Sequence, residues 1–448
     1  MASSGSITAE PPVVEAPPSA PGGKWRQYLV PLGFLAPALI FLVVWIVYPA
    51  IRTGYRSFFD RDATNFIWLD NYKEIFTTDT IITAIKNNAI WVLVVPVLVT
   101  AIGLVFAVLT ERVSWRLAFR TAVFMPMAIS LFAAGVIWRI MDQKEPERGT
   151  VNAVIGVFHD AFNPAGSLQG ALPSTPSLTG SPAQGYTSSK TVAPGGTTLL
   201  GLTGIPPDAV PSTATQAAVP ANVSSSQIGG VVWRDFKPGG GTPGKVDTEE
   251  LGLPGVTVDL QDSTGKTVDS ATSGDDGAFT FDDVSAGQHH AAIDEANFTP
   301  PFAGVAWLGP KLITPALIIA YLWVWAGFAM VVIAAGLAAI PRDTLEAART
   351  DGATEWQVFR RVTVPLLAPV LTVVFITMLI NVLKVFDVVL AVAPQSVQDD
   401  ANVIALAMWR ISFGGVNDFG LGSAIAVFLF VLVLPILLLN VRRFRREN

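Results

Sequence analysis

Six long stretches of this chain contain no charged residue, and each is long enough to cross a lipid bilayer, which takes roughly 20 residues of helix. Because the hydrocarbon interior offers no water to the backbone, such stretches must be helical. Charged residues make up 14% of the chain, against about 25% in soluble proteins, and the mean hydropathy is +0.49. The sequence therefore predicts an integral membrane protein, all-α in its membrane part, with six transmembrane helices. These cover Val30–Ile51, Ala89–Leu109, Thr121–Trp138, Leu312–Ile340, Leu366–Leu383 and Leu421–Leu439.

The composition excludes several other classes of protein. Lys and Arg number 29 against 35 Asp and Glu, so the chain lacks the positive field that drives nucleic-acid binding. Cysteine is absent, which excludes disulfides, thiolate metal sites and cysteine nucleophiles. No GxxxxGK[ST] loop for ATP phosphates is present. We expect a protein that is not an enzyme, with no catalytic residues, no metal site and no nucleic-acid partner.

Basic residues predict the orientation in the membrane. If the six spans are threaded in order, the arginines of the C-terminal tail and of the loops 112–120 and 342–361 fall on one side, which should be the cytoplasm. We therefore expect both termini inside. The first external loop departs from this rule, because it also carries basic residues, accompanied by acidic ones. Those basic residues are Arg52, Arg56, Arg61, Lys73 and Lys86.

The domain organisation follows from shifts in composition. Residues 1–23, rich in Pro, Ala and Ser, are expected to form a disordered cytoplasmic tail. Residues 24–163 and 305–448 contain three predicted spans each. Between them, 164–226 is dominated by Ser, Thr, Gly, Pro and Ala and is predicted to be a linker, whereas 227–304 alternates apolar and polar residues between turns. That pattern predicts an inserted β-sandwich, placed outside the cell by the orientation above.

The loop 341–365, between the fourth and fifth spans, carries the most informative pattern. Pro341 suits a helix start, Gly352 suits a left-handed helix stop, and Thr354 with Gln357 makes a capping box that opens a second short helix. Local physics predicts a helix, a tight turn and another helix at the cytoplasmic face. Such a knob suits a soluble partner, but it is equally consistent with an amphipathic connector lying on the membrane.

The same loop resembles the EAA loop of the permease subunits of binding-protein-dependent ABC importers, in particular carbohydrate permeases of the α-glucoside and maltose type. The residues that carry the likeness are Glu346, Ala347, Ala348, Asp351, Gly352, Ala353, Phe359 and Pro365. The resemblance implies that this loop couples the permease to a cytoplasmic ATPase. It further implies a second permease subunit, two ATP-binding cassette subunits and an extracellular solute-binding lipoprotein as partners. ATP and Mg²⁺ would belong to the ATPase, leaving no cofactor in this chain.

The inserted segment resembles a different family, the B-type repeats of Gram-positive surface adhesins, which are Cna-B-like sandwiches. The likeness rests on Gly229–Asp235, Leu253–Leu260 and Asp275–Val284. Some relatives bind calcium in the loop after the first strand. Here that loop keeps only Asp247, Glu249 and Glu250, whereas calcium takes six to eight oxygen ligands. A metal-free spacer is therefore favoured over a calcium site.

Polar and aromatic residues within the spans are candidates for lining a sugar pathway. Asn381, Lys384 and Asp387 follow one another at three-residue spacing at the end of the fifth span, and Trp323 and Trp325 lie in the fourth. Ionisable groups in a membrane helix are costly and point to function. The sequence is also consistent with a Lys384 that extends to the interface, and with tryptophans that belong to an interfacial belt facing membrane lipid.

Two other functions stay open from the sequence. The chain could be a permease for a non-sugar solute, or a membrane-anchored protein that binds a surface through its β-domain. Six spans argue against a simple anchor, which needs only one.

Overall fold

A computed structural model describes residues 25–447, so the predicted tail at 1–23 lies outside the described residues. The chain divides into two compact units, which are described separately below. Unit 1 comprises the chain up to Arg116, Phe328–Phe386 and the chain from Asn402 onward. Unit 2 comprises Leu117–Gly327 and Asp387–Ala401.

Unit 1 is helical. Its first apolar span runs through α1 (Trp25–Leu42), the π-helix η1 (Val43–Val47) and α2 (Tyr48–Arg56), and α3 (Asp70–Ile75) and α4 (Asp79–Arg112) follow. After the C-terminal half of α8 (Ile313–Ala338) come α9 (Arg342–Thr350), α10 (Glu355–Val358), the π-helix η5 (Phe359–Thr363) and α11 (Val364–Leu383). The unit ends with α13 (Ile404–Phe413) and α14 (Phe419–Glu447).

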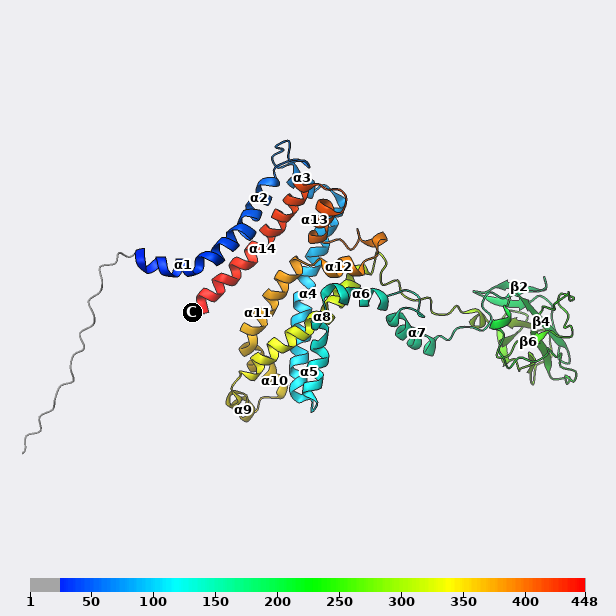
Figure 1. The fold of residues 1–448 in the computed structure, drawn as a ribbon. Helices are drawn as coiled ribbons and strands as arrows, with labels where there is room; N and C mark the ends of the chain where they lie inside the picture. Colours follow the sequence, from blue (N-terminus) through cyan, green and yellow to red (C-terminus); the bar gives the residue numbers. More distant parts are fainter. Residues whose placement is uncertain (1–24, 448) are drawn as a thin grey trace, which may run out of the picture. The chain divides into compact units, whose positions relative to one another are not determined.

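Small residues let the helices of unit 1 pack closely. A Cβ atom on Gly103 of α4 would collide with Ala329 of α8, and one on Gly336 of α8 would press on Val370 of α11. This is the packing expected in a bilayer, where close backbone approach replaces the hydrophobic drive between helices. Figure 1 shows α4 and α11 running alongside each other.

Asparagine side chains fasten α4 to the segment before α13. The Nδ2 atom of Asn87 donates to the backbone oxygen of Asn402 at 2.9 Å, and Oδ1 of Asn88 accepts from the backbone nitrogen of Ile404 at 2.7 Å. Both asparagines are buried. Since buried polar groups are costly unless they are hydrogen-bonded, these contacts fix how the two elements pair.

The third predicted span, Thr121–Trp138, is not one straight helix. In unit 2 the chain forms α5 (Arg116–Phe124), the 3-10 helix η2 (Met125–Ala128) and α6 (Leu131–Met141), and the two halves are bent by 101°. Pro126 lies in the bend, and Ser130 starts α6 afresh by accepting a hydrogen bond from the nitrogen of Ala133. The structure therefore has five apolar helices long enough to cross a membrane, or up to six if this bent pair is one span, among the described residues.

The rest of the helical part of unit 2 surrounds α6. It comprises α7 (Thr150–Phe162), the N-terminal half of α8, α12 (Asp387–Val392) and the 3-10 helix η6 (Gln395–Val397). Gly135 of α6 lies so close to α12 that a Cβ atom there would collide with Ala391. Together with unit 1 this confirms a helical membrane protein interrupted by a sheet domain.

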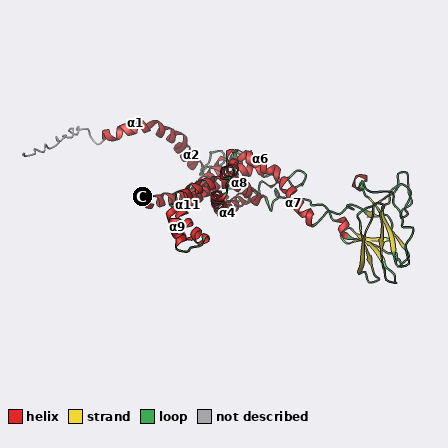
Figure 2. Ribbon diagram, turned by 90° about the horizontal axis from the view of Figure 1, so that it is seen from below, coloured by secondary structure: helices red, strands yellow, loops and turns green. Residues whose placement is uncertain are grey.

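The insertion is a sandwich of two sheets, seen as yellow strands in Figure 2. One sheet has the order β1-β4-β5-β6 with β9 on β5, and the other has the order β2-β3-β10-β7-β8. The predicted strands at 227–304 are confirmed. The strands are β1 (Leu172–Pro173), β2 (Leu178–Ser181), β3 (Gly185–Ser188), β4 (Thr197–Thr203), β5 (Ile228–Arg234), β6 (Leu251–Gly252), β7 (Thr257–Gln261), β8 (Thr267–Thr272), β9 (Ala278–Phe281) and β10 (His290–Ile293).

The prediction of a linker over 164–226 is wrong, because β1 to β4 lie within it. β4 pairs in parallel with β5, and β3 pairs with β10. Several large apolar residues of this region, including Tyr186, Leu200 and Leu202, are buried in the core of the sandwich. Single apolar residues among Ser, Thr and Gly resemble linker composition, yet each of these fills a core position next to strands distant in sequence.

The loop that binds calcium in some relatives of the B-type repeats is held here by hydrogen bonds within the protein. The buried carboxylate of Glu250 accepts from the indole Nε1 of Trp233 at 3.0 Å and from the backbone nitrogen of Asp247 at 2.9 Å. Burial raises the pKa of Glu250, and the nearby carboxylates of Asp235 and Asp247 raise it further. Within residues 25–447 no group of three or more His, Asp or Glu side chains is suited to hold a metal ion.

A single asparagine ties together the two chain segments that lead into and out of the insertion. The Nδ2 atom of buried Asn152 donates to the backbone oxygens of Gln143, Lys144 and Val305, and its Oδ1 accepts from the nitrogen of Val305 at 2.9 Å. The sandwich therefore leaves and rejoins the helical chain at one place.

Candidate functional site

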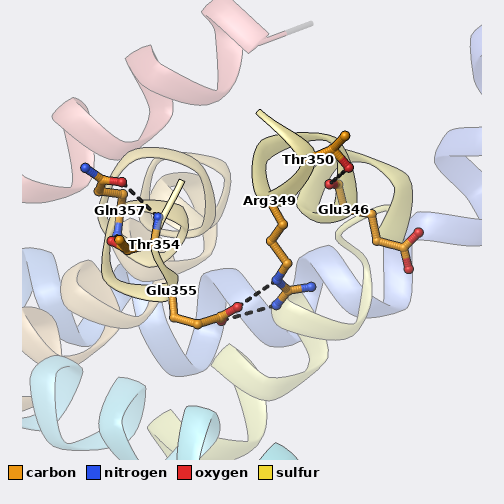
Figure 3. Close-up of polar contacts among 6 residues, drawn as sticks. All are labelled: Glu346, Arg349, Thr350, Thr354, Glu355 and Gln357. Carbon is orange, nitrogen blue, oxygen red and sulfur yellow. Dashed lines mark hydrogen bonds and ion pairs between the residues drawn. The ribbon is translucent and has the colours of Figure 1, made fainter. Parts of the chain in front are cut away.

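The predicted helix-turn-helix at 341–358 is confirmed. α9 begins at Arg342, directly after Pro341, and the turn contains Gly352 with φ +86°, in the left-handed region. The capping box is present: the nitrogen of Thr354 donates to Oε1 of Gln357 at 2.8 Å, and the nitrogen of Gln357 donates to Oγ1 of Thr354 at 3.4 Å. Figure 3 shows these side chains at the start of α10.

An ion pair across the turn joins the two short helices. Nε of Arg349 lies 2.8 Å from Oε1 of Glu355, and Nη2 lies 3.3 Å from Oε2, so the guanidinium binds both carboxylate oxygens (Figure 3). Such two-point contacts fix angle as well as distance. Neither residue was among the sequence candidates, although opposite charges six positions apart on either side of a glycine turn are the signal that could have found them.

The surface of this loop is open to a partner. Glu346, Ala347, Asp351 and Gly352 are exposed, whereas Ala348, Ala353 and Phe359 are half-buried. Trp356 is 65% exposed and lies against the ring of Phe359 at a centroid distance of 5.6 Å. The result is a rigid projection with acidic, small and aromatic side chains. It contains no catalytic arrangement and is suited to docking.

The projection continues directly into a membrane helix. α10, η5 and α11 form one apolar helix from Glu355 to Leu383. Pro365, which cannot donate a backbone hydrogen bond, lies just after the π-helical turn, where a wider hydrogen-bond ladder accommodates it. The sequence predicted a loop up to Pro365 and a separate span from Leu366. Because the helix is continuous, a force on α10 reaches α11 without a flexible joint.

The tryptophans of the fourth span each contact another aromatic residue. Trp323, 37% exposed, packs edge-on against Trp138 at 6.0 Å, and Trp325 lies 5.8 Å from Tyr321. Trp323 thus keeps part of its surface free, as an aromatic platform for a ligand requires.

The polar triplet of the fifth span is not on one helix. α11 ends at Leu383, Lys384 is its C-cap, and Asp387 opens the new helix α12. The prediction that Asn381, Lys384 and Asp387 continue on neighbouring turns is therefore wrong. Val385 and Phe386 take up a non-helical conformation that redirects the chain. Lys384 and Asp387 are both exposed, and Asn381 is half-buried.

Fold and loop together define a class: a polytopic membrane transport subunit with a docking projection on one membrane helix. Comparison with known proteins gives the family. Residues 283–444 match the binding-protein-dependent transport system inner membrane component, and residues 226–304 match the SdrD B-like domain. Residues 283–444 therefore carry the domain of the first of these families, that of a membrane-embedded transport subunit and not an enzyme, and the loop 341–365 lies within it, where that family has its EAA motif.

Relatives match most of the chain. The osmoprotective compounds uptake permease protein GgtC of Synechocystis is 28% identical over 416 residues, 93% of this chain and 99% of that protein. The alpha-glucoside transport system permease protein AglF of Rhizobium meliloti is 28% identical over 93% of this chain and 82% of that protein.

A solved structure has the same fold. A bacterial ABC transporter involved in the import of the acidic polysaccharide alginate contains a chain that superposes with a TM-score of 0.55 and 16% identity, over 94% of this chain and 96% of that one. At this identity the likeness concerns the fold alone.

Proposed function

We propose that this protein is the permease subunit of an ATP-driven importer for sugars, with α-glucosides as the substrate class. The observation that carries the proposal is the EAA projection, exposed on one side and continuous with α11 on the other. The α-glucoside relative AglF supports the choice of substrate, since it is similar over nearly the whole chain.

The proposed coupling acts through Glu346, Ala347, Ala348, Asp351, Gly352, Ala353, Phe359 and Pro365. A cytoplasmic ATPase grips α9 and α10, and closure of two such ATPases on ATP and Mg²⁺ moves the projection. α11 then moves as a lever, because its helix has no break between Glu355 and Leu383. ATP hydrolysis belongs to the ATPases, and this chain contributes the moving wall of the pathway.

The proposed assembly contains this chain, a second and different permease subunit, two ATP-binding cassette subunits and an extracellular solute-binding lipoprotein. Both termini and the EAA projection face the cytoplasm, and the sandwich faces outward. For the solute route we propose Trp323 and Trp325 as aromatic platforms. Asn381, Lys384 and Asp387 add hydrogen-bonding groups near the α11–α12 break.

The test is uptake of radiolabelled maltose, trehalose and sucrose by cells that express the ATPase and binding protein, with and without this chain. We expect uptake of at least one α-glucoside to require it. If the chain is inserted and assembled but none of the three sugars is taken up, the α-glucoside assignment is wrong.

A second candidate, import of an osmoprotective solute, is favoured by the similarity to GgtC. It is separated from the first by growth in high salt. If this chain protects cells from salt when an osmolyte is supplied, and deletion leaves sugar uptake unchanged, the second function replaces the first.

A further inference from the structure

A cavity of about 430 Å³ in unit 1 has no role in the transport scheme above. It lies between the end of α2 and the start of α14, which pack together (Figure 1). Gly420 brings α14 so close to the loop after α2 that a Cβ atom there would collide with the backbone oxygen of Phe59. The walls are thus held at short range by backbone packing. They include Arg52, Tyr55, Arg56, Phe59, Phe419 and Ser423.

Two arginines give this cavity its charge. Arg52 and Arg56 lie one turn apart on the same face of α2, at the end of the apolar span Pro31–Arg56. Like charges at this spacing destabilise a helix, and ionisable groups in a span are costly. Neither arginine forms an ion pair with any carboxylate in the part of the chain that the structure describes. They are two of the five basic residues that depart from the positive-inside pattern.

The guanidinium of Arg56 is only partly satisfied. Its Nη2 donates to the backbone oxygen of Arg61, whereas its Nη1 is buried and has no hydrogen-bond partner within residues 25–447. An arginine that merely extended toward the membrane surface would keep its nitrogens in contact with water or headgroups. A buried and unpartnered nitrogen instead points to a ligand that accepts its hydrogen bond.

Neighbouring carboxylates are already engaged elsewhere. Asp60 accepts hydrogen bonds from the nitrogen and Oγ1 of Thr64 and from Nδ2 of Asn65, at 2.8 to 2.9 Å. Burial opposes its ionisation, but the hydrogen bonds from Asn65 and Thr64 outweigh burial and lower the pKa of Asp60. Asp418 caps α14 through the nitrogen of Leu421 at 2.9 Å. Neither carboxylate therefore forms an ion pair with Arg52 or Arg56, which leaves the two guanidinium groups free to contact an anion directly.

We propose that this cavity binds the phosphodiester headgroup of an anionic membrane lipid such as phosphatidylglycerol. Arg52 and Arg56 contact the phosphate, and the rings of Tyr55, Phe59 and Phe419 line the path of the glycerol and the first methylenes. The site lies where a span ends, at the depth of lipid headgroups. Within unit 1, α2 and α3 lie at one end and α9 and α10 at the other (Figure 1), so the lipid belongs to the leaflet opposite the EAA projection.

The test is native mass spectrometry of the complete detergent-purified transporter, titrated with phosphatidylglycerol or phosphatidylcholine. We expect preferential retention of phosphatidylglycerol, and a loss of its affinity by about tenfold in the double variant Arg52→Gln/Arg56→Gln. Arg61→Gln is the control: it removes one positive charge from the loop just after α2, and its exposed side chain does not line the cavity. This control should bind as the wild type does.

Two further variants separate binding from folding. Ser423→Phe fills the cavity without changing charge and should also displace the lipid, whereas Arg52→Lys/Arg56→Lys should keep most of the binding. Equal retention of the two lipids by the wild type, or unchanged binding in the glutamine double variant, would overturn the proposal. So would displacement of phosphatidylglycerol by millimolar inorganic phosphate, which would make this a site for free anions. Phosphatidylglycerol binding to the isolated chain but not to the complete transporter would likewise overturn it, because a partner subunit would then occupy the cavity.

Discussion

At the scale of single residues, Gly352 sets the geometry of the EAA projection. Its φ of +86° is strained for a branched side chain, by about 1–3 kcal/mol, yet nothing lies within 4 Å of where a Cβ atom would be. Substitutions of Gly352 therefore differ in the backbone strain that they cause and not in steric clashes within the protein. We expect Gly352→Val to distort the turn and lower co-purification of the ATPase by about tenfold. Gly352→Asn should stay near wild type, because asparagine tolerates the left-handed region.

These two variants have similar bulk at a site with free space, so they separate backbone strain from steric blocking of the ATPase. Equal losses with valine and asparagine would show that any side chain blocks docking. The strain account of Gly352 would then be wrong.

The pair Arg349–Glu355 should act on coupling more than on stability. It is exposed, and exposed ion pairs contribute little to stability because water and salt screen them. We expect Arg349→Gln or Glu355→Gln to lower sugar uptake about twofold with no change in melting temperature. The exchange Arg349→Glu/Glu355→Arg should restore uptake. If the losses of the two glutamine variants simply add in the double variant Arg349→Gln/Glu355→Gln, the two residues do not act together.

At the scale of elements, α6 ends in a buried carboxyl group that makes the helix sensitive to pH. Asp142 is 3% exposed, one of its oxygens has no partner among the described residues, and burial raises its pKa to about 6. A folded-state pKa above the unfolded value of 3.8 means that the stability from this group is complete below about pH 4 and lost as pH rises through 6.

We therefore expect the wild type to lose stability between pH 4 and pH 7 relative to Asp142→Asn, by up to about 2 kcal/mol. The measurement is the melting temperature of both proteins in detergent across that range. If the melting temperatures of the two proteins change with pH in parallel, burial does not raise the pKa of Asp142.

The sequence predicted those elements whose signals are local. The apolar stretches, the alternating strands at 227–304 and the capping box at Thr354 and Gln357 each depend on residues a few positions apart. It missed the elements that depend on distant partners. Strand β4 is stabilised by parallel pairing with β5 and by core residues such as Leu200, none of which can be recognised from the composition of 164–226.

The breaks in the spans were missed for a related reason. Hydropathy does not distinguish a bent apolar segment from a straight one, so the bend near Pro126 was missed. The predicted end of the fifth span at Leu383 agrees with the end of α11, but the placement of Asp387 on a further turn of the same helix was wrong. Proline positions do not predict the breaks either, because Pro365 lies inside a continuous helix, where a π-helical turn precedes it. For the proposed coupling site, the sequence predicted a set of docking residues and the helix-turn-helix that carries them, but not the ion pair across the turn.

At the scale of the whole molecule, the sandwich leaves and rejoins the helical chain at one place. Near its base the backbone nitrogen of Gly166 donates to the oxygen of Thr299 at 2.9 Å, and that of Leu168 donates to the oxygen of Asn297 at 2.9 Å. The two ends of the sandwich are therefore neighbours, so the domain can be deleted and the chain rejoined by a short loop. We expect replacement of residues 166–299 by a short Gly-Ser loop to leave membrane insertion and ATPase binding unchanged.

Asn152 should be kept in that deletion, because it joins the flanking segments. A matched variant that combines the deletion with Asn152→Ala tests this role, and it should lower the yield of assembled transporter. Failure of the simple deletion to insert would show that the sandwich is integral to the fold of the membrane part.

The measurement that tests the account most directly is ATP-dependent sugar uptake by proteoliposomes that contain this chain, its partner permease, the ATPases and the binding protein. With ATP inside the vesicles, the wild type should accumulate a labelled α-glucoside, and Gly352→Val should lose both uptake and the ATP hydrolysis that substrate stimulates. Full uptake and full stimulated hydrolysis with Gly352→Val, in vesicles of equal protein content, would contradict coupling through the EAA projection.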